Sequence, residues 1–246
     1  MANEWDSYPL RVDDEPASIF LDLALARSAP RTSHPTMAYL RVRMRQPRPD
    51  GLSSQEEAQA LFALEDALDQ AFAEGGHAIY AGRNTSAGNR DFYFYTADGA
   101  RFESAAERAM QGFPGYEFSI GTQPDPEWRV YFDFLYPTPD DHQRMLNRRV
   151  LHQLAQHGDD PEKPRPIDHM AVFGGAAVCA AFIEQVRGQG FAVTAGHPLT
   201  RDDGSFAVEF TRADRPAEIH GITLELVALI HSHQGDYDGW GCPVEK

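Results

Sequence analysis

The segment DHMAVFGGAAVCAAFIEQVRGQGFAV, residues 168–193, decides the fold of the C-terminal part of the chain. It predicts a short apolar strand, a helix over 175–187 and a second strand over 191–196. The turn RDDG then leads into a third strand, SFAVEFTR, and a helix over 217–231 follows. This β-α-β-β-α order is most of a ferredoxin-like split β-α-β unit, and we expect the tail of the chain to add its last extended segment.

Two segments near the N-terminus have the two-residue period of strands. SIFLDLAL, residues 18–25, and MAYLRVRMR, residues 37–45, alternate apolar side chains with others. The turn-rich residues between them favour a hairpin with a long loop, in which Asp22 could lie across from an arginine of the second strand. We interpret these arginines mainly as a solvent-facing row, namely Arg41, Arg43 and Arg45.

An amphipathic helix is predicted after these strands. Its apolar stripe consists of Leu61, Leu64, Leu68 and Phe72. A capping box is available at its start, because Ser53 or Ser54 is followed three residues later by Glu56 or Glu57. Gly75 and Gly76 are expected to end the helix.

The rest of the N-terminal part predicts a mostly antiparallel sheet with helices packed on it. Residues 77–95, HAIYAGRNTSAGNRDFYFY, indicate two short strands around a turn. A short helix over 102–111 follows, and GYEFSIG (115–121) and EWRVYFDFLYP (127–137) indicate two further strands. The fold class predicted for the whole chain is therefore α+β.

The length of 246 residues predicts two domains of about 100 to 150 residues each. A helix is expected after Pro139, and the segment GDDPEKPRP, residues 158–166, contains three prolines and five charged residues, which is typical of a linker. We therefore expect an α+β domain over 1–157, a linker over 158–166 and a second domain over 167–246.

Composition narrows the classes of partner. Apolar residues make up 42% and charged residues 24%, which is typical of a soluble globular protein. The chain has 37 acidic and 22 basic residues, a formal net charge of −15, and both halves are acidic. Such a surface repels nucleic acid, so we expect no direct nucleic acid binding. It favours a cationic partner, although the acidity could also serve solubility alone.

Cysteine usage and the apolar runs indicate the compartment. Cys179 and Cys242 are the two cysteines, too few for a disulfide scaffold or a four-thiolate zinc site. MANEWDSYPL has no apolar core of a secretory signal, and no uncharged apolar run approaches the roughly 20 residues of a membrane span. These features predict a protein of the bacterial cytoplasm, without a membrane partner.

No metal or cofactor is predicted. His220 and His231 are eleven residues apart on the last expected helix, roughly 16 Å along its axis. His231 and His233 could converge with Asp236 or Cys242 if the helix ends at His231, but this spacing matches no strong zinc signature. A calcium loop beginning at Asp236 would lack its distant glutamate.

The segment GRNTSAGNR, residues 82–90, is a possible ligand-binding loop. Arg83 and Arg90 accompany several hydroxyl groups, a combination that could hold a phosphate or a carboxylate. It lacks the lysine of a phosphate loop, and a strand rather than a helix follows, so a tight hairpin is the favoured interpretation. No catalytic signature is present in the sequence, and no catalytic residue is predicted.

The last segment, GDYDGWGCPVEK, has the composition of a recognition surface. Tyr237 and Trp240 offer large contact areas, while Asp236 and Asp238 can pair with Arg or Lys of a partner. Alternatively, Trp240 packs onto the sheet and the glycines only permit the turns. Both can hold together, with Trp240 as an anchor and the two carboxylates exposed. We expect these four residues to be the partner-binding ones.

Two parts of the chain resemble known protein families. Residues from about 166 to 246 resemble the regulator of ribonuclease E activity B family, through residues 168–193, DDGSFAVEFTR, the 219–231 helix and above all YDGWG. Residues from about 1 to 140 resemble a bacterial domain of unknown function fused ahead of that regulator, through GRNTSAGNRDFYFY and WRVYFDFLYP. The resemblance implies a non-enzymatic protein with a ferredoxin-like fold that binds ribonuclease E and inhibits its action on RNA.

Three hypotheses follow. The first is a protein-binding regulator whose partner is a ribonuclease E-like enzyme with a basic surface. The second is a small-molecule or metal-binding enzyme with its site between the two domains, using Arg83, Arg90 and His233. The third makes the N-terminal domain an adaptor that positions the regulator.

Overall fold

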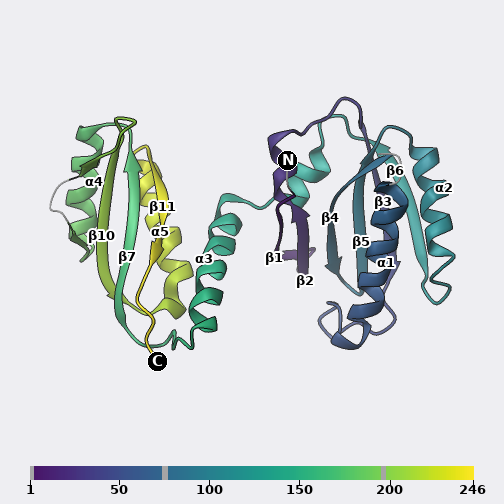
Figure 1. The fold of residues 1–246 in the computed structure, drawn as a ribbon, viewed down its shortest axis with the longest axis horizontal. Coiled ribbons are helices and arrows are strands. Elements are labelled where there is room, and N and C mark those ends of the chain that lie inside the picture. The colour runs from purple at the N-terminus through teal and green to yellow at the C-terminus, as the bar shows by residue number, and fades with distance from the viewer. Residues whose placement is uncertain (1–2, 74–76, 195–197) are drawn as a thin grey trace. The chain divides into compact units, whose positions relative to one another are not determined.

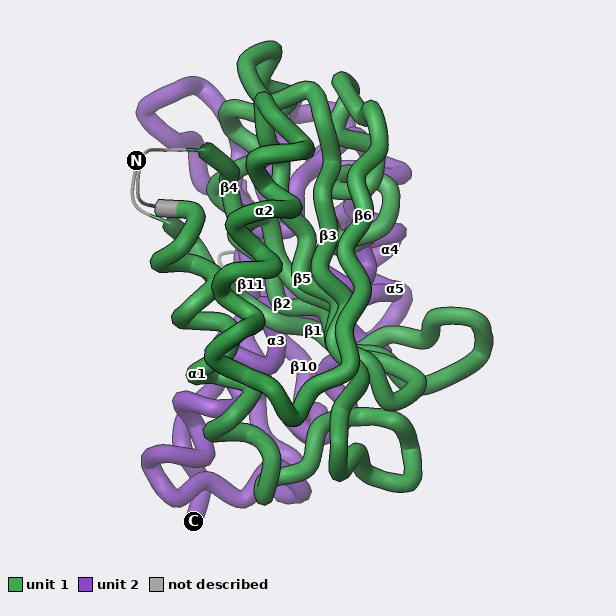
Figure 2. The backbone as a smooth tube through the Cα atoms, turned by 90° about the vertical axis from the view of Figure 1, so that its right-hand side faces the viewer, with its two compact units in different colours: residues 1–137 green, residues 138–246 purple. Residues whose placement is uncertain are grey.

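The structure, a computed structural model, describes residues 3–73, 77–194 and 198–246. The chain divides into two compact units, residues 1–137 and 138–246, each of which combines helices with an antiparallel sheet (Figures 1 and 2). The α+β class and the two-domain layout predicted from the sequence are thus confirmed. Among the described residues, no helix is both long and apolar enough to cross a membrane.

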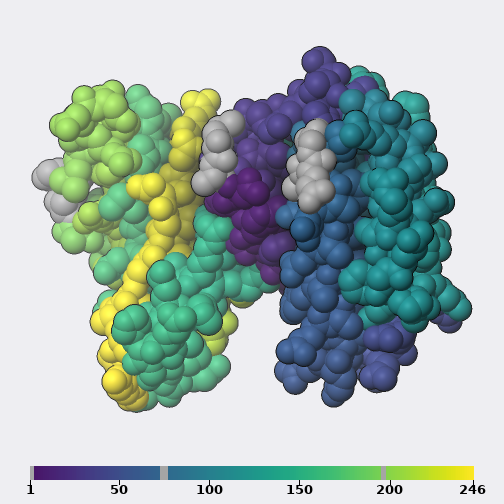
Figure 3. Space-filling model, turned by 45° about the vertical axis from the view of Figure 1, so that its right-hand side comes forward, coloured from purple at the N-terminus to yellow at the C-terminus, as the bar shows by residue number. Residues whose placement is uncertain are grey.

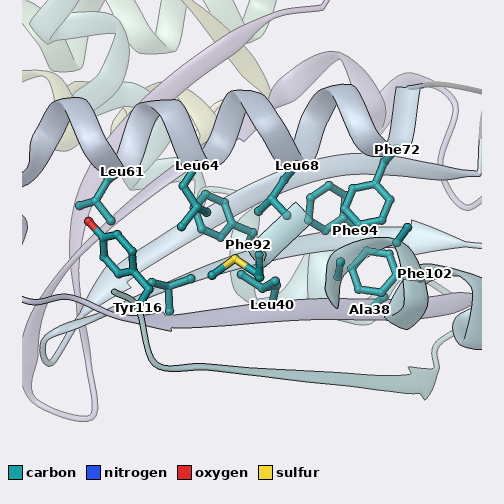
Figure 4. Packing of buried hydrophobic residues seen from close by; sticks show 14 of the residues in the cluster. Ala38, Leu40, Leu61, Leu64, Leu68, Phe72, Phe92, Phe94, Phe102 and Tyr116 are labelled. Atoms are coloured by element: carbon teal, nitrogen blue, oxygen red, sulfur yellow. The ribbon is translucent and has the colours of Figure 1, made fainter. Parts of the chain in front are cut away.

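The N-terminal unit contains a six-stranded antiparallel sheet with the order β1-β2-β4-β5-β3-β6. Its strands are β1 (Trp5–Val12), β2 (Glu15–Asp22), β3 (Thr36–Arg43), β4 (Ala78–Ser86), β5 (Asn89–Thr96) and β6 (Phe118–Pro124). Helices α1 (Gln55–Ala73) and α2 (Gly99–Met110) share one core with this sheet. The predicted apolar stripe of α1 packs on Phe92 and Phe94, as Figure 4 shows.

The capping box of α1 forms only in part. Ser54 Oγ accepts a hydrogen bond from the Glu57 backbone N–H at 3.3 Å. The Glu57 carboxylate, however, accepts from the backbone N–H groups of Arg45 at 2.8 Å and Gln46 at 2.7 Å. Glu57 therefore ties the end of β3 to the helix instead of closing the cap. The expected stop at Gly75 and Gly76 lies outside the described residues.

The predicted hairpin between residues 18–25 and 37–45 is wrong. β2 pairs with β1 and β4, whereas β3 pairs with β5 and β6. β2 ends at Asp22, whose carboxylate accepts from the backbone N–H of Ala24 at 3.0 Å and caps the short 3-10 helix η1 (Leu23–Arg27). Arg41 pairs with Asp91 at 2.7 Å rather than with Asp22, and the arginine row faces solvent as expected.

The segment EWRVYFDFLYP, predicted as a strand, is helical instead. Residues Val130–Leu135 form a π-helical turn, η2. The Asp125 carboxylate begins it by accepting from the backbone N–H groups of Arg129 at 2.8 Å and Val130 at 3.0 Å. Tyr131 and Leu135, four residues apart, are buried on one side, so the alternation of aromatic residues concealed a helical spacing.

The C-terminal unit has the predicted β-α-β-β-α order followed by a last strand from the tail. The sheet order is β11-β7-β10-β8, with β9 also paired to β10 and all pairs antiparallel. Its elements are β7 (Arg165–Phe173), α4 (Ala176–Gly188), β8 (Ala192–Val193), β9 (Leu199–Thr200), β10 (Phe206–Asp214), α5 (Ile219–Ser232) and β11 (Gly235–Gly241). A short 3-10 turn, η3 (Pro216–Glu218), precedes α5. Part of the expected 191–196 strand lies outside the described residues.

Helix α3 (Pro139–Gln156) belongs to the C-terminal unit, so the units divide before this helix and not at residues 158–166. The reason is a buried polar network around Asn147, which is fully enclosed. Its amide nitrogen donates to Thr223 Oγ1 of α5 at 2.6 Å, and its oxygen accepts from Trp240 Nε1 of β11 at 2.9 Å. Gln143 Nε2 adds a third bond at 3.0 Å. Separating α3 would leave these buried groups unpaired, which costs about 1–3 kcal/mol each.

Residues 158–166 do not form the predicted linker but are fixed to the C-terminal unit. Arg165 and Asp159 form an ion pair at 2.5 Å, with both side chains only 1% exposed. Arg165 also donates to the carbonyl of Asp160 at 3.0 Å and to Cys242 Sγ at 3.4 Å. Asp159 in turn accepts from the Glu245 backbone N–H at 2.8 Å. The prolines and charges of this segment shape a loop that holds the end of the chain.

Gly235 offers a test of the packing of β11. A Cβ atom at this position would collide with the ring of Phe173, which is buried in the core of the unit. We expect Gly235→Ala to lower the free energy of unfolding of the C-terminal unit by about 1–3 kcal/mol, measured by urea denaturation. Gly241→Ala is the matched control, because a Cβ there meets no atom within 4 Å of the described structure. Equal stability of the two variants would contradict this packing.

Candidate protein-binding face

The side chains of GDYDGWG alternate between the two faces of the C-terminal sheet. Asp236 lies opposite Val172, and Tyr237 lies opposite Ala171, which belongs to the core shared with α4 and α5. A bulge between Tyr237 and Gly239 shifts the register, and Gly239 has a φ of +127°, which favours glycine. Trp240 consequently lies opposite His169 and points to the same face as Tyr237. The segment thus separates its aromatic residues from Asp236.

The two aromatic residues of the tail are anchors. The Tyr237 hydroxyl lies 2.8 Å from His169 Nδ1, and its ring packs against the core of the unit. Trp240 Nε1 donates to the buried Asn147 amide. Of the four residues predicted to contact a partner, Tyr237 and Trp240 therefore have their polar groups engaged inside the unit, and Asp236 and Asp238 are exposed. The last residues of the chain, yellow in Figure 3, form a strip on the molecular surface.

The face of the sheet opposite α4 and α5 is acidic. It carries Asp168 and Met170 from β7 and Glu209 from β10, which lies directly opposite Met170. Asp236 joins them from β11, and Asp238 lies at the bulge beside them. Asp168, Asp236 and Asp238 are exposed, while Met170 and Glu209 are half-buried. Strands β7, β10 and β11, distant in sequence, thus bring four carboxylates onto one surface.

A hollow of about 440 Å³ is lined by residues of this surface. The described residues that line it include Asp168, Glu209 and Asp238, and neither lysine nor arginine is among them. Trp240 contributes to its lining beside Gly239. The hollow therefore suits a cationic or hydrogen-bond-donating side chain of a partner.

The carboxylates of this face have few competing cations within the protein. Asp238 lies 3.7 Å from Arg201, and both side chains are nearly half exposed. An exposed pair of this kind contributes about 0–1 kcal/mol, so a partner can displace it readily. Within the described parts of the chain, Asp168, Glu209 and Asp236 form no ion pair. We refer to Asp168, Glu209, Asp236 and Asp238 as the acidic face.

His169 lies directly behind the acidic face. His169 is 2% exposed, and burial lowers the pKa of its imidazole to about 4. Burial also raises the pKa of Tyr237, so the Tyr237 hydroxyl stays protonated beside His169 Nδ1. His169 Nε2 has no hydrogen-bond partner among the described residues. At neutral pH this imidazole adds no positive charge behind the carboxylates.

Sequence reasoning found Asp236 and Asp238 but not Asp168, Met170 and Glu209. The strands that carry them were predicted, and a period of two along 168–173 and 206–212 places Asp168 and Glu209 opposite the apolar core positions. The sequence pattern does not show which strands lie next to one another in the sheet. Only the strand order β11-β7-β10 shows that the carboxylates share a surface.

The other predicted ligand-binding residues divide between the two units. Arg83 and Arg90 lie in β4 and β5 of the N-terminal unit, where GRNTSAGNR forms the predicted hairpin. His233 lies in the C-terminal unit at the end of α5, where its Nε2 is 2.8 Å from Gln185 Oε1. Cys242 accepts from Arg165. Across the described ranges, no group of three or more His, Cys, Asp and Glu residues is placed to hold a metal ion.

Comparison with known protein families follows the division into units. Residues 3–136, which span more than half of the chain, match the family of unknown function DUF695. The chain belongs to the DUF695 family. Residues 144–242 match the family described as regulator of ribonuclease activity B. Both resemblances inferred from the sequence are thus confirmed, and the second family indicates a regulator of ribonuclease activity.

Other comparisons of this DUF695 protein add little. A search of curated proteins found no match. A solved structure named as a candidate glycine cleavage system transcriptional repressor is 8% identical, covers 85% of this chain and 98% of its own, and has a TM-score of 0.28. An unknown protein from Galdieria sulphuraria is 11% identical, with 82% and 95% of the two chains covered and a TM-score of 0.23. At these TM-scores, neither structure informs the fold or the function.

The burial of His169 predicts a pH dependence of stability. Because its pKa falls from 6.5 in the unfolded chain to about 4 in the fold, the unfolded chain binds more protons between these values. The free energy of unfolding should therefore fall as the pH drops from about 6.5 to about 4, by about 3 kcal/mol from this group.

The measurement is urea denaturation across this pH range for the wild type and for His169→Gln, which does not titrate. The glutamine amide can form a hydrogen bond with the Tyr237 hydroxyl. The stability of each protein at neutral pH is therefore the reference for its own pH profile. We expect the pH profile of the variant to be flatter than that of the wild type. Identical slopes in the two proteins would show that His169 does not carry this dependence.

Proposed function

We propose that the C-terminal unit is a protein-binding regulator that inhibits a ribonuclease E-type endoribonuclease by covering a basic surface of that enzyme with the acidic face. The observation that carries the proposal is the convergence of Asp168, Glu209, Asp236 and Asp238 on one side of the sheet. The family of residues 144–242 supports a ribonuclease as the regulated enzyme.

The charge of the protein favours a protein target over RNA itself. A net charge of −15 disfavours contact with phosphates, because each such contact needs a lysine or arginine. A nuclease must present cations to RNA, and these cations suit the acidic face. Binding of this kind makes the carboxylates compete with RNA phosphates for the same arginines and lysines.

This arrangement inhibits without chemistry. Carboxylates pair with arginine through two parallel hydrogen bonds, and Asp168, Asp236 and Asp238 are exposed for such pairing. Met170, which is half-buried, lies two residues from Asp168 on β7 and opposite Glu209 on β10, and supplies an adaptable apolar contact. The aromatic anchors keep β11 in register, so the carboxylates are held on a rigid sheet rather than on a loose tail.

The test uses charge reversal on the full-length protein. We expect Asp236→Lys and Asp168→Lys each to weaken binding to the ribonuclease roughly tenfold or more, because a lysine there repels the basic partner surface. Binding is measured by co-purification from the native host and by titration with the purified enzyme. The same variants should relieve inhibition of RNA cleavage in proportion. Raising the salt concentration should weaken wild-type binding.

Glu225→Lys is the matched control. Glu225 is an exposed residue of α5, on the helical side of the unit, and its reversal makes the same change in net charge. We expect this variant to bind and inhibit like the wild type. Equal loss in all three variants would indicate a general charge effect and not the acidic face. Recovery of no ribonuclease, together with unchanged RNA cleavage in the presence of the wild type, would refute the proposal.

A further inference from the structure

A hollow of about 900 Å³ lies within the N-terminal unit, between α1 and the strands β1, β2 and β4. Figure 1 shows these three strands to one side of α1, which covers the other part of the same sheet face. Phe62 and Glu65 of α1 form one wall. The strands supply Trp5, Phe20 and Arg83. Neither family match assigns a role to this hollow.

The hollow has an aromatic floor. Trp5 stacks on Phe20 with ring centroids 5.0 Å apart and an angle of 13° between the planes. Tyr80 lies 5.1 Å from Trp5, centroid to centroid. Arg83 rests over the Phe20 ring, with Cζ 4.2 Å from the centroid. These surfaces can receive a planar or apolar group.

Four arginines line the hollow, namely Arg31, Arg48, Arg83 and Arg90, and of these Arg48 and Arg83 have carboxylate partners. Arg83 pairs with Glu65, which also accepts from the Tyr80 hydroxyl at 2.7 Å. Arg83 is therefore neutralised within the protein. Arg90 forms no ion pair with any described residue. Its partners are hydroxyls, since Nε donates to Thr85 Oγ1 and Nη2 to Ser53 Oγ, each at 3.2 Å.

Arg90 is also deeply enclosed. The residue is 4% exposed, and its Nη1 has no hydrogen-bond partner in the described structure. Burial and, after it, the neighbouring charge of Arg83 lower the pKa of Arg90 to about 10, although the charges of Glu65 and Glu57 act in the opposite direction. The guanidinium nevertheless remains protonated at neutral pH. A buried charge without a counter-ion is destabilising, so Arg90 is placed at a cost that folding alone does not explain.

We propose that this hollow binds a small organic anion, one with a carboxylate or phosphate group for Arg90 and a planar apolar part for the aromatic floor. The anion would complete the missing ion pair through the free Nη1. Phe62, whose ring centroid lies 6.0 Å from Arg90 Cζ, is 50% exposed and belongs to α1. Rotation of this ring is the movement by which we expect an anion to reach the buried Nη1, and such rotations are fast for exposed side chains.

The position of the charges orients the ligand. Arg90 and Ser53 lie near the start of α1, where the helix dipole favours negative charge. Asp66 and Asp69, exposed carboxylates that also line the hollow, lie further along the helix. Asp69 is roughly 20 Å from the first turn along the axis. The anionic group therefore belongs at the Arg90 end.

The test begins with the full-length wild type at low ionic strength. Benzoate and phenyl phosphate are the two anionic probes, and benzyl alcohol is the neutral probe of similar size. We expect at least one anion to bind, measured by isothermal titration calorimetry, at least tenfold more tightly than benzyl alcohol. The better of the two anions identifies the group, carboxylate or phosphate, that the site prefers. No binding of either anion, or equal binding of all three probes, would overturn the proposal.

Arg90→Met then tests the assigned residue. The loss of a charge-assisted hydrogen bond predicts affinity for the anion at least tenfold weaker. The melting temperature of the unliganded variant should not fall, because the substitution removes an unpaired buried charge. Arg108→Met is the matched control, since Arg108 is exposed on α2 and does not line the hollow. Retained affinity for the anion in Arg90→Met would refute the role of Arg90. If the variant does not fold, the comparison of the three probes on the wild type still tests the proposal.

Discussion

The amide of Asn147 holds the C-terminal unit together. It is fully buried and connects α3 to α5 through Thr223 and to β11 through Trp240. A buried amide with all its partners in place is specific, because a shifted helix or strand would leave polar atoms without hydrogen bonds. This network fixes α3 to the unit and holds Trp240 on the inner face. The position of Trp240 in turn sets which residues of β11 point outward.

The tail GDYDGWG can therefore be understood position by position. Gly235 avoids the Phe173 ring, and Gly239 permits the bulge. Tyr237 and Trp240 form hydrogen bonds with buried partners, so their role is in folding. The aspartates satisfy nothing buried. Gly235, Tyr237, Gly239 and Trp240 each have a role inside the unit, whereas the exposed carboxylates of Asp236 and Asp238 are accessible to a partner.

Local patterns in the sequence predicted the helices and strands better than they predicted which strands pair. The stripe of α1, the GRNTSAGNR hairpin and the β-α-β-β-α order follow from periodicity and turn residues, which act over a few positions. The hairpin of residues 18–25 with 37–45 failed because strand pairing depends on the whole sheet. The linker over 158–166 failed because its composition could not show the Arg165–Asp159 pair. The acidic face and the hollow at Arg90 could not be predicted for the first reason, since their residues come from separate elements that only the folded chain brings together.

The charged groups of the two proposed sites differ in exposure, because the acidic face is largely exposed to solvent whereas Arg90 is buried. Exposed carboxylates remain solvated, so the acidic face costs the fold little and can meet a partner that exchanges water for arginine or lysine. Arg90 is enclosed, so its unpaired charge is destabilising until an anion enters. A solvated site suits a large partner that docks over a surface, whereas an enclosed site suits a small molecule that fits within it. A chain with both arrangements has a physical basis for binding two different classes of ligand, one on each unit.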